Sequence, residues 1–157
     1  MKIESVDVGF YNVPLPVVLS DSTHGDISSF ELITVRVTSE NGQEGVGYTY
    51  TPGTGGAGVY ALIDKYLAKH IVGKDCFSVE SLWEEMWWHL HYIGRGGAVS
   101  FAISAVDIAL WDLKARCLNL PLWKLLGGSS NEVKAYAGGI DLQFGLDELK
   151  KQTEGFL

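Results

Sequence analysis

Residues 102–128 read AISAVDIALWDLKARCLNLPLWKLLGG, and the first part of this stretch is apolar on nearly every side of a helix. Such a distribution is typical of a helix that is buried on several sides. We predict that the helix extends from about Gly97 to Leu118, because Pro121 disfavours a helical conformation at the residue before it and lacks a backbone donor. The helix nevertheless carries two carboxylates, Asp107 and Asp112, and their role depends on what surrounds them.

These two carboxylates point in different directions. Five residues correspond to ~500° of helical rotation, so Asp107 and Asp112 diverge by roughly 140°. They cannot share a metal ion or flank one substrate. On the helical projection, Asp107 lies near one stripe with Ser100 and Ser104. We interpret the two carboxylates as structural groups, satisfied by hydroxyl or backbone donors, rather than as catalytic groups.

The N-terminal part of the chain has the period of β-strands. Residues 5–10 alternate polar and apolar side chains, and residues 31–38 and 43–50 are interpreted as two further strands. Asn41 and Gly42, between the last two strands, are the favoured pair for a tight hairpin turn. The sequence therefore predicts a three-stranded antiparallel meander.

Two segments around these strands have the composition of loops. Residues 14–29 contain two prolines and a cluster of Ser, Asp and Gly, and residues 51–58 are rich in glycine. Loops of this kind are mobile and often cover or shape a site.

Two helices are predicted between the meander and the buried helix. The first begins at Val59, and Ser78 is a plausible N-cap of the second. The apolar stripes are Leu62, Ile63, Tyr66 and Leu67 in the first helix, and Leu82, Met86 and Leu90 in the second. Strands followed by helices, without alternation, indicate an α+β domain that ends at about Gly128.

The pattern changes after this domain. Residues 133–140, VKAYAGGI, have the character of a short buried strand, and residues 145–156 that of an amphipathic helix. A strand followed by a helix is the start of a parallel α/β structure. The chain contains no parallel neighbour for this strand, so we interpret residues 129–157 as the beginning of an incomplete domain.

Charge and composition exclude several classes of partner. Twelve basic and nineteen acidic residues give a net charge of −7, without any run of Lys or Arg. Nucleic acid and anionic membrane surfaces are therefore not expected as partners. No stretch approaches the ~20 apolar residues of a membrane span, and the alternating start resembles no signal or transit peptide. We expect a cytoplasmic protein.

Residues 102–128 resemble the signature of the mandelate racemase/muconate lactonizing enzyme family of the enolase superfamily. Residues 47–52, GYTYTP, resemble the racemase-like branch of that family, and residues 45–48 lack the Glu of the muconate-like G-x-G-E. The resemblance implies that residues 1–128 form an N-terminal capping domain. Residues 129–157 would be the first strand-helix unit of a (β/α)8 TIM-type barrel that is truncated in this chain.

The resemblance also implies an activity for the parent enzyme. Members of the family abstract the proton α to a carboxylate with a Lys or His base and hold the enediolate on Mg²⁺. These groups lie on later barrel strands, and residues 154–157, EGFL, resemble only the start of the second strand. We therefore expect no catalytic residue and no metal ligand in this chain, and no activity from the chain alone.

For the parent we expect an acid-sugar dehydratase or a 2-hydroxy-acid racemase, homo-oligomeric, acting on a small carboxylate substrate. A cycloisomerase or epimerase of the same family is the alternative within the enzyme class. An alternative from another class is a complete, non-catalytic module that self-associates through its exposed strand at 133–140.

The cap of this family supplies two loops that close over the mouth of the barrel and touch the distal end of the substrate. Here they would be residues 16–28 and 51–58. Tyr50 matches a tyrosine that faces substrate in the racemase-like pattern, and His24 lies in the first loop. We predict substrate-binding roles for Tyr50 and His24, with Thr51 and Gly25 beside them. Simple packing of Tyr50 and a solvated loop position for His24 are the competing interpretations.

Overall fold

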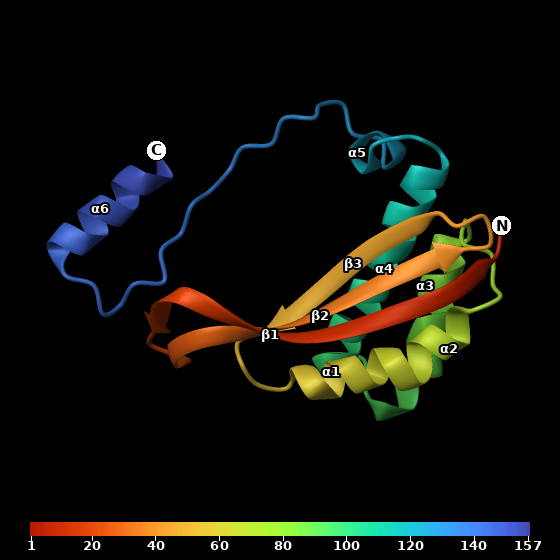
Figure 1. Ribbon diagram of the computed structural model, residues 1–157, viewed down its shortest axis with the longest axis horizontal. Helices are drawn as coiled ribbons and strands as arrows, with labels where there is room; N and C mark the ends of the chain where they lie inside the picture. Colours follow the sequence, from red (N-terminus) through yellow and green to blue (C-terminus); the bar gives the residue numbers. More distant parts are fainter.

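The structure, a computed structural model, describes residues 1–157 and consists of a sheet with helices packed on one face (Figure 1). The strands are β1 (Ile3–Asp21), β2 (Gly25–Ser39) and β3 (Glu44–Thr51). The helices are α1 (Gly56–Leu62), the π-helical turn η1 (Ile63–Leu67), α2 (Ala68–Ile71), α3 (Val79–His89), the 3₁₀ turn η2 (His91–Ile93), α4 (Ala98–Cys117), α5 (Leu122–Leu125) and α6 (Leu146–Phe156).

The predicted meander is confirmed. The strands are ordered β1-β2-β3 and both pairs are antiparallel. The turn between β2 and β3 differs in detail, because Gly42 has φ 78° whereas Asn41 does not adopt a positive φ. The Asn41 side chain instead accepts a hydrogen bond from the Ser39 hydroxyl at 2.6 Å, and this bond holds a longer loop.

The predicted loop at residues 14–29 is wrong. These residues form the outer part of a long hairpin, and β1 and β2 remain paired as far as Asp21 and Gly25, with one register shift between Pro14 and Leu19. Proline is tolerated here because β1 is an edge strand, whose outward N–H groups need no ladder partner. We call residues 14–29 the hairpin arm, which extends beyond the helices in Figure 1.

The predicted buried helix is confirmed as α4, and it packs closely against β3. Nine of its residues are buried, and eight of these share the core with the inward side chains of β2. A Cβ atom on Gly45 would overlap the backbone of Ala109 and Leu113, and one on Gly47 would overlap the backbone of Ala105. The helix and the strand can approach so closely because the strand presents two glycines to the helix backbone.

The two earlier helices were predicted with different success. The second is confirmed as α3, which begins after Ser78 and buries Leu82 and Met86 with the following Leu90. In the first, the buried stripe is Val59, Ile63, Leu67 and Ile71, and the predicted Tyr66 is 52% exposed. The π-helical turn η1 explains the difference, because its wider turn keeps residues four apart on one face.

Residues 129–145 were predicted to include a buried strand at 133–140, and this prediction is wrong. Residues 133–140 pair with no strand, and Val133 is 89% and Tyr136 95% exposed. A strand requires hydrogen-bond partners from another segment, and no neighbouring strand is present here.

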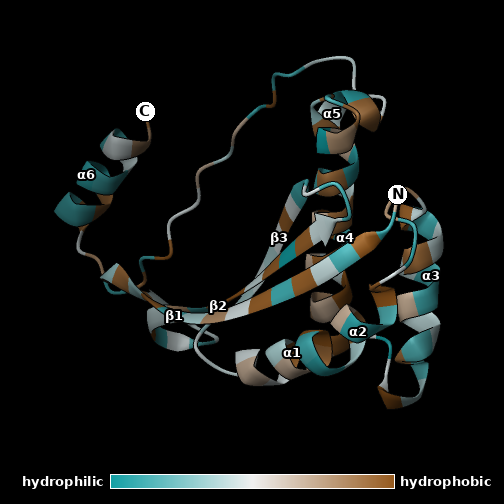
Figure 2. Cartoon of the chain, turned by 45° about the vertical axis from the view of Figure 1, so that its right-hand side comes forward, coloured by the Kyte–Doolittle hydropathy of each residue, from teal (hydrophilic) through white to brown (hydrophobic).

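The predicted final helix is confirmed as α6, which lies apart from the sheet and its helices (Figure 2). The start of a second strand at 154–157 is wrong, since residues 154–156 belong to α6. A helix satisfies its own backbone groups, whereas a strand cannot do so alone.

Candidate functional site

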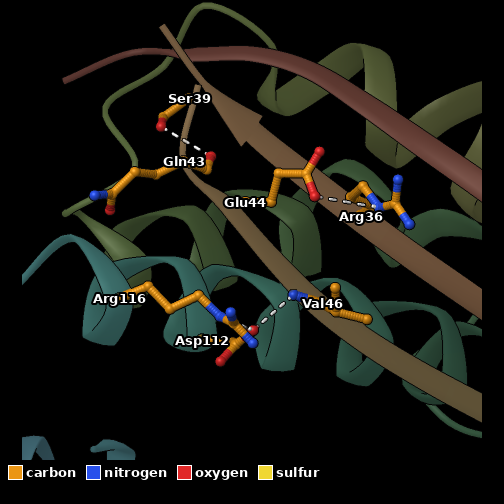
Figure 3. Close-up of polar contacts among 7 residues, drawn as sticks. All are labelled: Arg36, Ser39, Gln43, Glu44, Val46, Asp112 and Arg116. Carbon is orange, nitrogen blue, oxygen red and sulfur yellow. Dashed lines mark hydrogen bonds and ion pairs between the residues drawn. The ribbon is translucent and has the colours of Figure 1, made fainter. Parts of the chain in front are cut away.

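The carboxylate of Asp112 is part of the scaffold, as predicted. Its Oδ2 accepts the backbone N–H of Val46 at 2.9 Å and the Arg116 Nε–H at 2.9 Å (Figure 3). Val46 lies on β3, the second edge strand of the sheet, so the helix carboxylate satisfies a donor that the ladder leaves free. Asp112 thereby fixes the position of β3 along α4.

Asp107 is half-buried on another side of α4 and borders a cleft of about 200 Å³. The pKa of this carboxyl is raised, first by burial and second by the nearby negative charge of Glu80. The predicted hydroxyl partner is not found, because Ser100 Oγ donates to the carbonyl of Arg95 at 3.0 Å. Asp107 and Asp112 do not meet, in agreement with the helical projection.

His24 and Gly25 lie in the turn at the end of the hairpin arm. Asp21 Oδ1 accepts the backbone N–H groups of Thr23 at 2.7 Å and His24 at 2.6 Å, and Asp21 Oδ2 lies 2.8 Å from His24 Nδ1. These hydrogen bonds, led by the backbone N–H of His24, lower the pKa of Asp21 to about 2. Because the ionised carboxylate can only accept, Nδ1 carries the proton in this contact, and Nε2 makes no hydrogen bond within the chain. Gly25 has φ 69°, a conformation that favours glycine.

The hairpin arm contacts the segment that follows residues 133–140. Leu142 N donates to the carbonyl of Ser20 at 3.1 Å, and the Gln143 side chain donates to the carbonyl of Val18 at 2.7 Å. Ser20 and Asp141 also form a parallel bridge. These residues are more than a hundred positions apart, and nothing in the local sequence pattern indicated the contact.

Tyr50 lies at the end of β3, beside the base of the hairpin arm, and is 53% exposed. Its ring meets that of Phe30 edge-on, with the ring centroids 5.3 Å apart. Val13, Phe30, Leu32 and Tyr50 line an apolar hollow of about 270 Å³. The structure therefore brings Tyr50 onto an open surface that is mainly apolar.

Thr51 is turned inward and is 7% exposed. Its hydroxyl donates to Glu31 Oε2 at 2.8 Å, and the same oxygen accepts the backbone N–H of Gly56 at 2.8 Å. Gly55, at the N-cap of α1, has no side chain with which to cap the helix, so Glu31 supplies the acceptor from the adjacent strand. One carboxylate therefore holds both ends of the loop at 52–55.

The sequence alone did not indicate Glu31. The only signal was a carboxylate in an apolar strand, and its register opposite Thr51 became visible only with the fold.

A second polar cluster lies away from these loops, between α2 and α3. His70 stacks on His89 with ring centroids 4.3 Å apart, and Lys74 Nζ lies 3.0 Å from His70 Nε2. Lys74 also donates to Glu85. The pKa of His70 is lowered, first by burial and then by the charges of Lys74 and His89, against the opposing effect of Glu85.

The chain brings together no group of three or more His, Cys, Asp or Glu side chains that could hold a metal ion. The residues present therefore do not fit a magnesium site of their own. None of the helices is both long enough and apolar enough to span a membrane.

Residues 5–127 match the N-terminal domain of the mandelate racemase / muconate lactonizing enzyme family, and the chain belongs to that family. It is 52% identical over 155 residues to a 3,6-anhydro-alpha-L-galactonate cycloisomerase from Streptomyces coelicolor, covering 99% of this chain and 43% of that protein. It is 34% identical to an L-talarate/galactarate dehydratase from Salmonella typhimurium, covering 97% of this chain and 39% of that protein.

Solved structures agree with this relationship. A racemase from Streptomyces coelicolor A3(2), crystallised with bound magnesium, superposes with a TM-score of 0.96 at 52% identity, over 98% of this chain and 43% of that one. The L-talarate/galactarate dehydratase from Salmonella typhimurium, with Mg and L-lyxarohydroxamate, superposes with a TM-score of 0.89 at 33% identity. The superposition covers 98% of this chain and 40% of that one. The chain thus spans less than half the length of these relatives.

Proposed function

We propose that this chain is the N-terminal part of a magnesium-dependent enolase-superfamily enzyme that abstracts the proton α to the carboxylate of an acid sugar or hydroxy acid. Residues 1–128 would be the capping domain and residues 129–157 the first unit of a (β/α)8 barrel. The observation that carries the proposal is the contact of the hairpin arm with residues 141–143. The arm thereby lies at the carboxyl end of the segment 133–140, which would be a barrel strand once neighbouring strands pair with it, and catalytic groups lie at the carboxyl ends of barrel strands.

In this proposal the chain supplies the substrate lid. His24 presents Nε2 from the turn of the arm, and Tyr50 presents its ring and hydroxyl from the end of β3. Thr51 and Gly25 act indirectly, since Thr51 anchors the loop at 52–55 through Glu31 and Gly25 permits the turn that follows His24. A closed lid excludes water and orients the substrate.

The proton-transfer groups and the magnesium ligands would lie in the part of the enzyme outside this chain. When bound there, the cation supplies electrostatic stabilisation of the charge that develops on the substrate carboxylate. The residues of this chain contribute binding and shielding, so we propose that the chain is inactive by itself. The complete enzyme would be a homo-oligomer.

Two groups of reactions of this type are supported to different degrees. An acid-sugar dehydratase or 2-hydroxy-acid racemase agrees with the GYTYTP segment and with the dehydratase relative at 34% identity. A cycloisomerase is the second candidate, and the relative at 52% identity over 99% of the chain favours it.

The test is an assay of the complete enzyme with Mg²⁺ against a panel of acid sugars and hydroxy acids. Turnover of at least one acid, with exchange of its α-hydrogen for solvent deuterium, is expected, and the 157-residue chain should show neither. Exchange or turnover catalysed by the isolated chain would contradict the lid role. Failure of the complete enzyme on every acid would contradict the enzyme proposal and favour a self-associating module, which size-exclusion chromatography of the chain would detect.

A further inference from the structure

We propose that the lid selects its substrate by charge: it accepts a monocarboxylic acid whose distal end is uncharged and disfavours a dicarboxylic acid. This inference rests on the proposed function, because it concerns the end of the substrate that the lid would touch. It divides the acid sugars into two chemical classes, aldonates with one carboxylate and aldarates with one at each end.

Carboxylates gather at the end of the hairpin arm. Ser20 pairs with Asp26 on one side and forms the bridge to Asp141 on the other. Directly paired residues of neighbouring strands project to the same face, so Asp26 lies beside Ser20, whereas the carboxylate of Asp141 lies against Gly139 and Gln152. Asp26 is exposed and takes part in no ion pair or side-chain hydrogen bond. Asp21 lies one residue further along β1 and is ionised throughout the neutral range.

No positive group offsets these charges within the lid. Residues 14–30 and 51–58 contain neither Lys nor Arg. His24 is the only basic side chain of the arm, and its Nδ1 is already bound to Asp21. A second substrate carboxylate beneath the arm would therefore meet the negative charges of Asp21 and Asp26, and no Lys or Arg of these two segments could pair with it.

The remaining surface suits a neutral and weakly hydrated group. The hollow formed by Val13, Phe30, Leu32 and Tyr50 is lined by apolar side chains only, with a volume of about 270 Å³. The C–H face of a sugar ring or the carbon chain of a neutral polyol can lie against such a surface. A carboxylate would lose its hydration there without compensation.

The test compares an aldonate and the aldarate of the same carbon chain and stereochemistry as substrates of the complete enzyme. We expect kcat/KM for the aldonate to be at least about tenfold higher than for the aldarate. Two like charges about 10 Å apart, at an effective dielectric of about 20, repel strongly enough to lower binding by about this factor. The difference should reside mainly in KM and should shrink when ionic strength is raised.

Two variants sharpen the comparison. Asp26→Asn should reduce the preference several-fold, and Asp26→Lys should reduce it further by improving KM for the aldarate. The control is Glu40→Gln, which removes the same charge from the turn at the opposite end of the sheet. It should leave the ratio unchanged.

The outcomes separate this inference from the function on which it rests. An aldarate used as well as the aldonate, or a ratio that none of the Asp26 variants changes, would overturn the charge selection while the enzyme proposal stands. Failure of the complete enzyme on both acids and on the wider panel would overturn the enzyme proposal itself, and the charge selection with it.

Discussion

The two ends of the sheet are held in different ways. At the inner end, β3 lies directly on α4, with Gly45 and Gly47 against the helix backbone and Asp112 bound to Val46. At the outer end, the hairpin arm is held mainly by a small number of polar contacts, such as those of Asp21 with the turn and Ser20 with Leu142. The comparison indicates that substitutions should cost most stability where β3 lies on α4 and there is no space for an added atom, and less in the hairpin arm.

The largest effect of a substitution on the free energy of unfolding is expected at the contact of β3 with α4. Gly47→Ala places a Cβ atom where the backbone of Ala105 lies, and backbone cannot move aside as a flexible side chain would. We expect a loss of about 3 kcal/mol in the free energy of unfolding, at the upper end of overpacking effects. Urea unfolding monitored by tryptophan fluorescence measures it.

The matched control is Gly58→Ala in α1, where an added Cβ would meet no atom within 4 Å and φ is not positive. Alanine is the better helix former, so this variant should be neutral or slightly stabilising. If Gly47→Ala were as stable as Gly58→Ala, the close packing described for β3 and α4 would be incorrect.

A smaller effect is expected at Glu31, which lies between the two ends. Glu31→Ala removes the acceptor of the Thr51 hydroxyl and of the Gly56 N–H, and we expect it to cost about 1–2 kcal/mol. Hydrogen exchange of the Gly56 amide should accelerate more than the change in global stability accounts for. Glu4→Gln, at an exposed residue with no side-chain partner, is the control and should change neither quantity.

The contrast between the two ends also explains what could be predicted from the sequence. The meander and α4 follow from local periodicity, because each depends on the alternation or the helical spacing of nearby residues. The strand character of the arm could not be predicted, since Pro14 and Pro16 indicate a loop unless β1 is known to be an edge strand. The prediction of a strand at 133–140 was wrong for the opposite reason. The composition of this segment favours a strand, but a strand needs a hydrogen-bonded partner.

The candidate site divides in the same way. His24 and Tyr50 were selected from a resemblance of local motifs, and the structure places both on open surface of the cap. Glu31 and the docking of Ser20 on Leu142 depend on register and on contacts between distant segments. Local sequence patterns therefore identified the exposed candidate residues. The residues that position them could be identified only from the structure.

A moderate dependence of stability on pH is expected away from both ends, at His70. Because its pKa in the folded chain is lowered from the ordinary 6.5, the folded state binds fewer protons than the unfolded state below that value. Stability should be retained above pH 6.5 and should fall as the pH drops from 6.5 toward the folded pKa. Thermal midpoints measured from pH 8 to pH 5.5 test this.

Lys74, His89 and Glu85 surround His70, so His70→Gln should reduce the dependence without removing contributions from His89. If the His70→Gln variant keeps the full pH dependence of the thermal midpoint, another titrating group causes that dependence.

The smallest effect on stability is expected at Asp21, in the arm. Asp21→Asn removes the charged acceptor of the turn, yet the turn is exposed and packs on no core, so the unfolding midpoint near neutral pH should fall only slightly. The contribution of Asp21 to stability is present above its ordinary pKa of 3.8 and is lost as the pH falls toward the folded pKa of about 2.

The more sensitive measurement of this substitution is the tautomer of His24, determined by ¹⁵N NMR. The proton should reside on Nδ1 in the natural chain and should distribute to Nε2 in the variant, because the carboxylate that holds it is gone. A tautomer that remains on Nδ1 after the substitution would show that the backbone of the turn, and not Asp21, orients the ring.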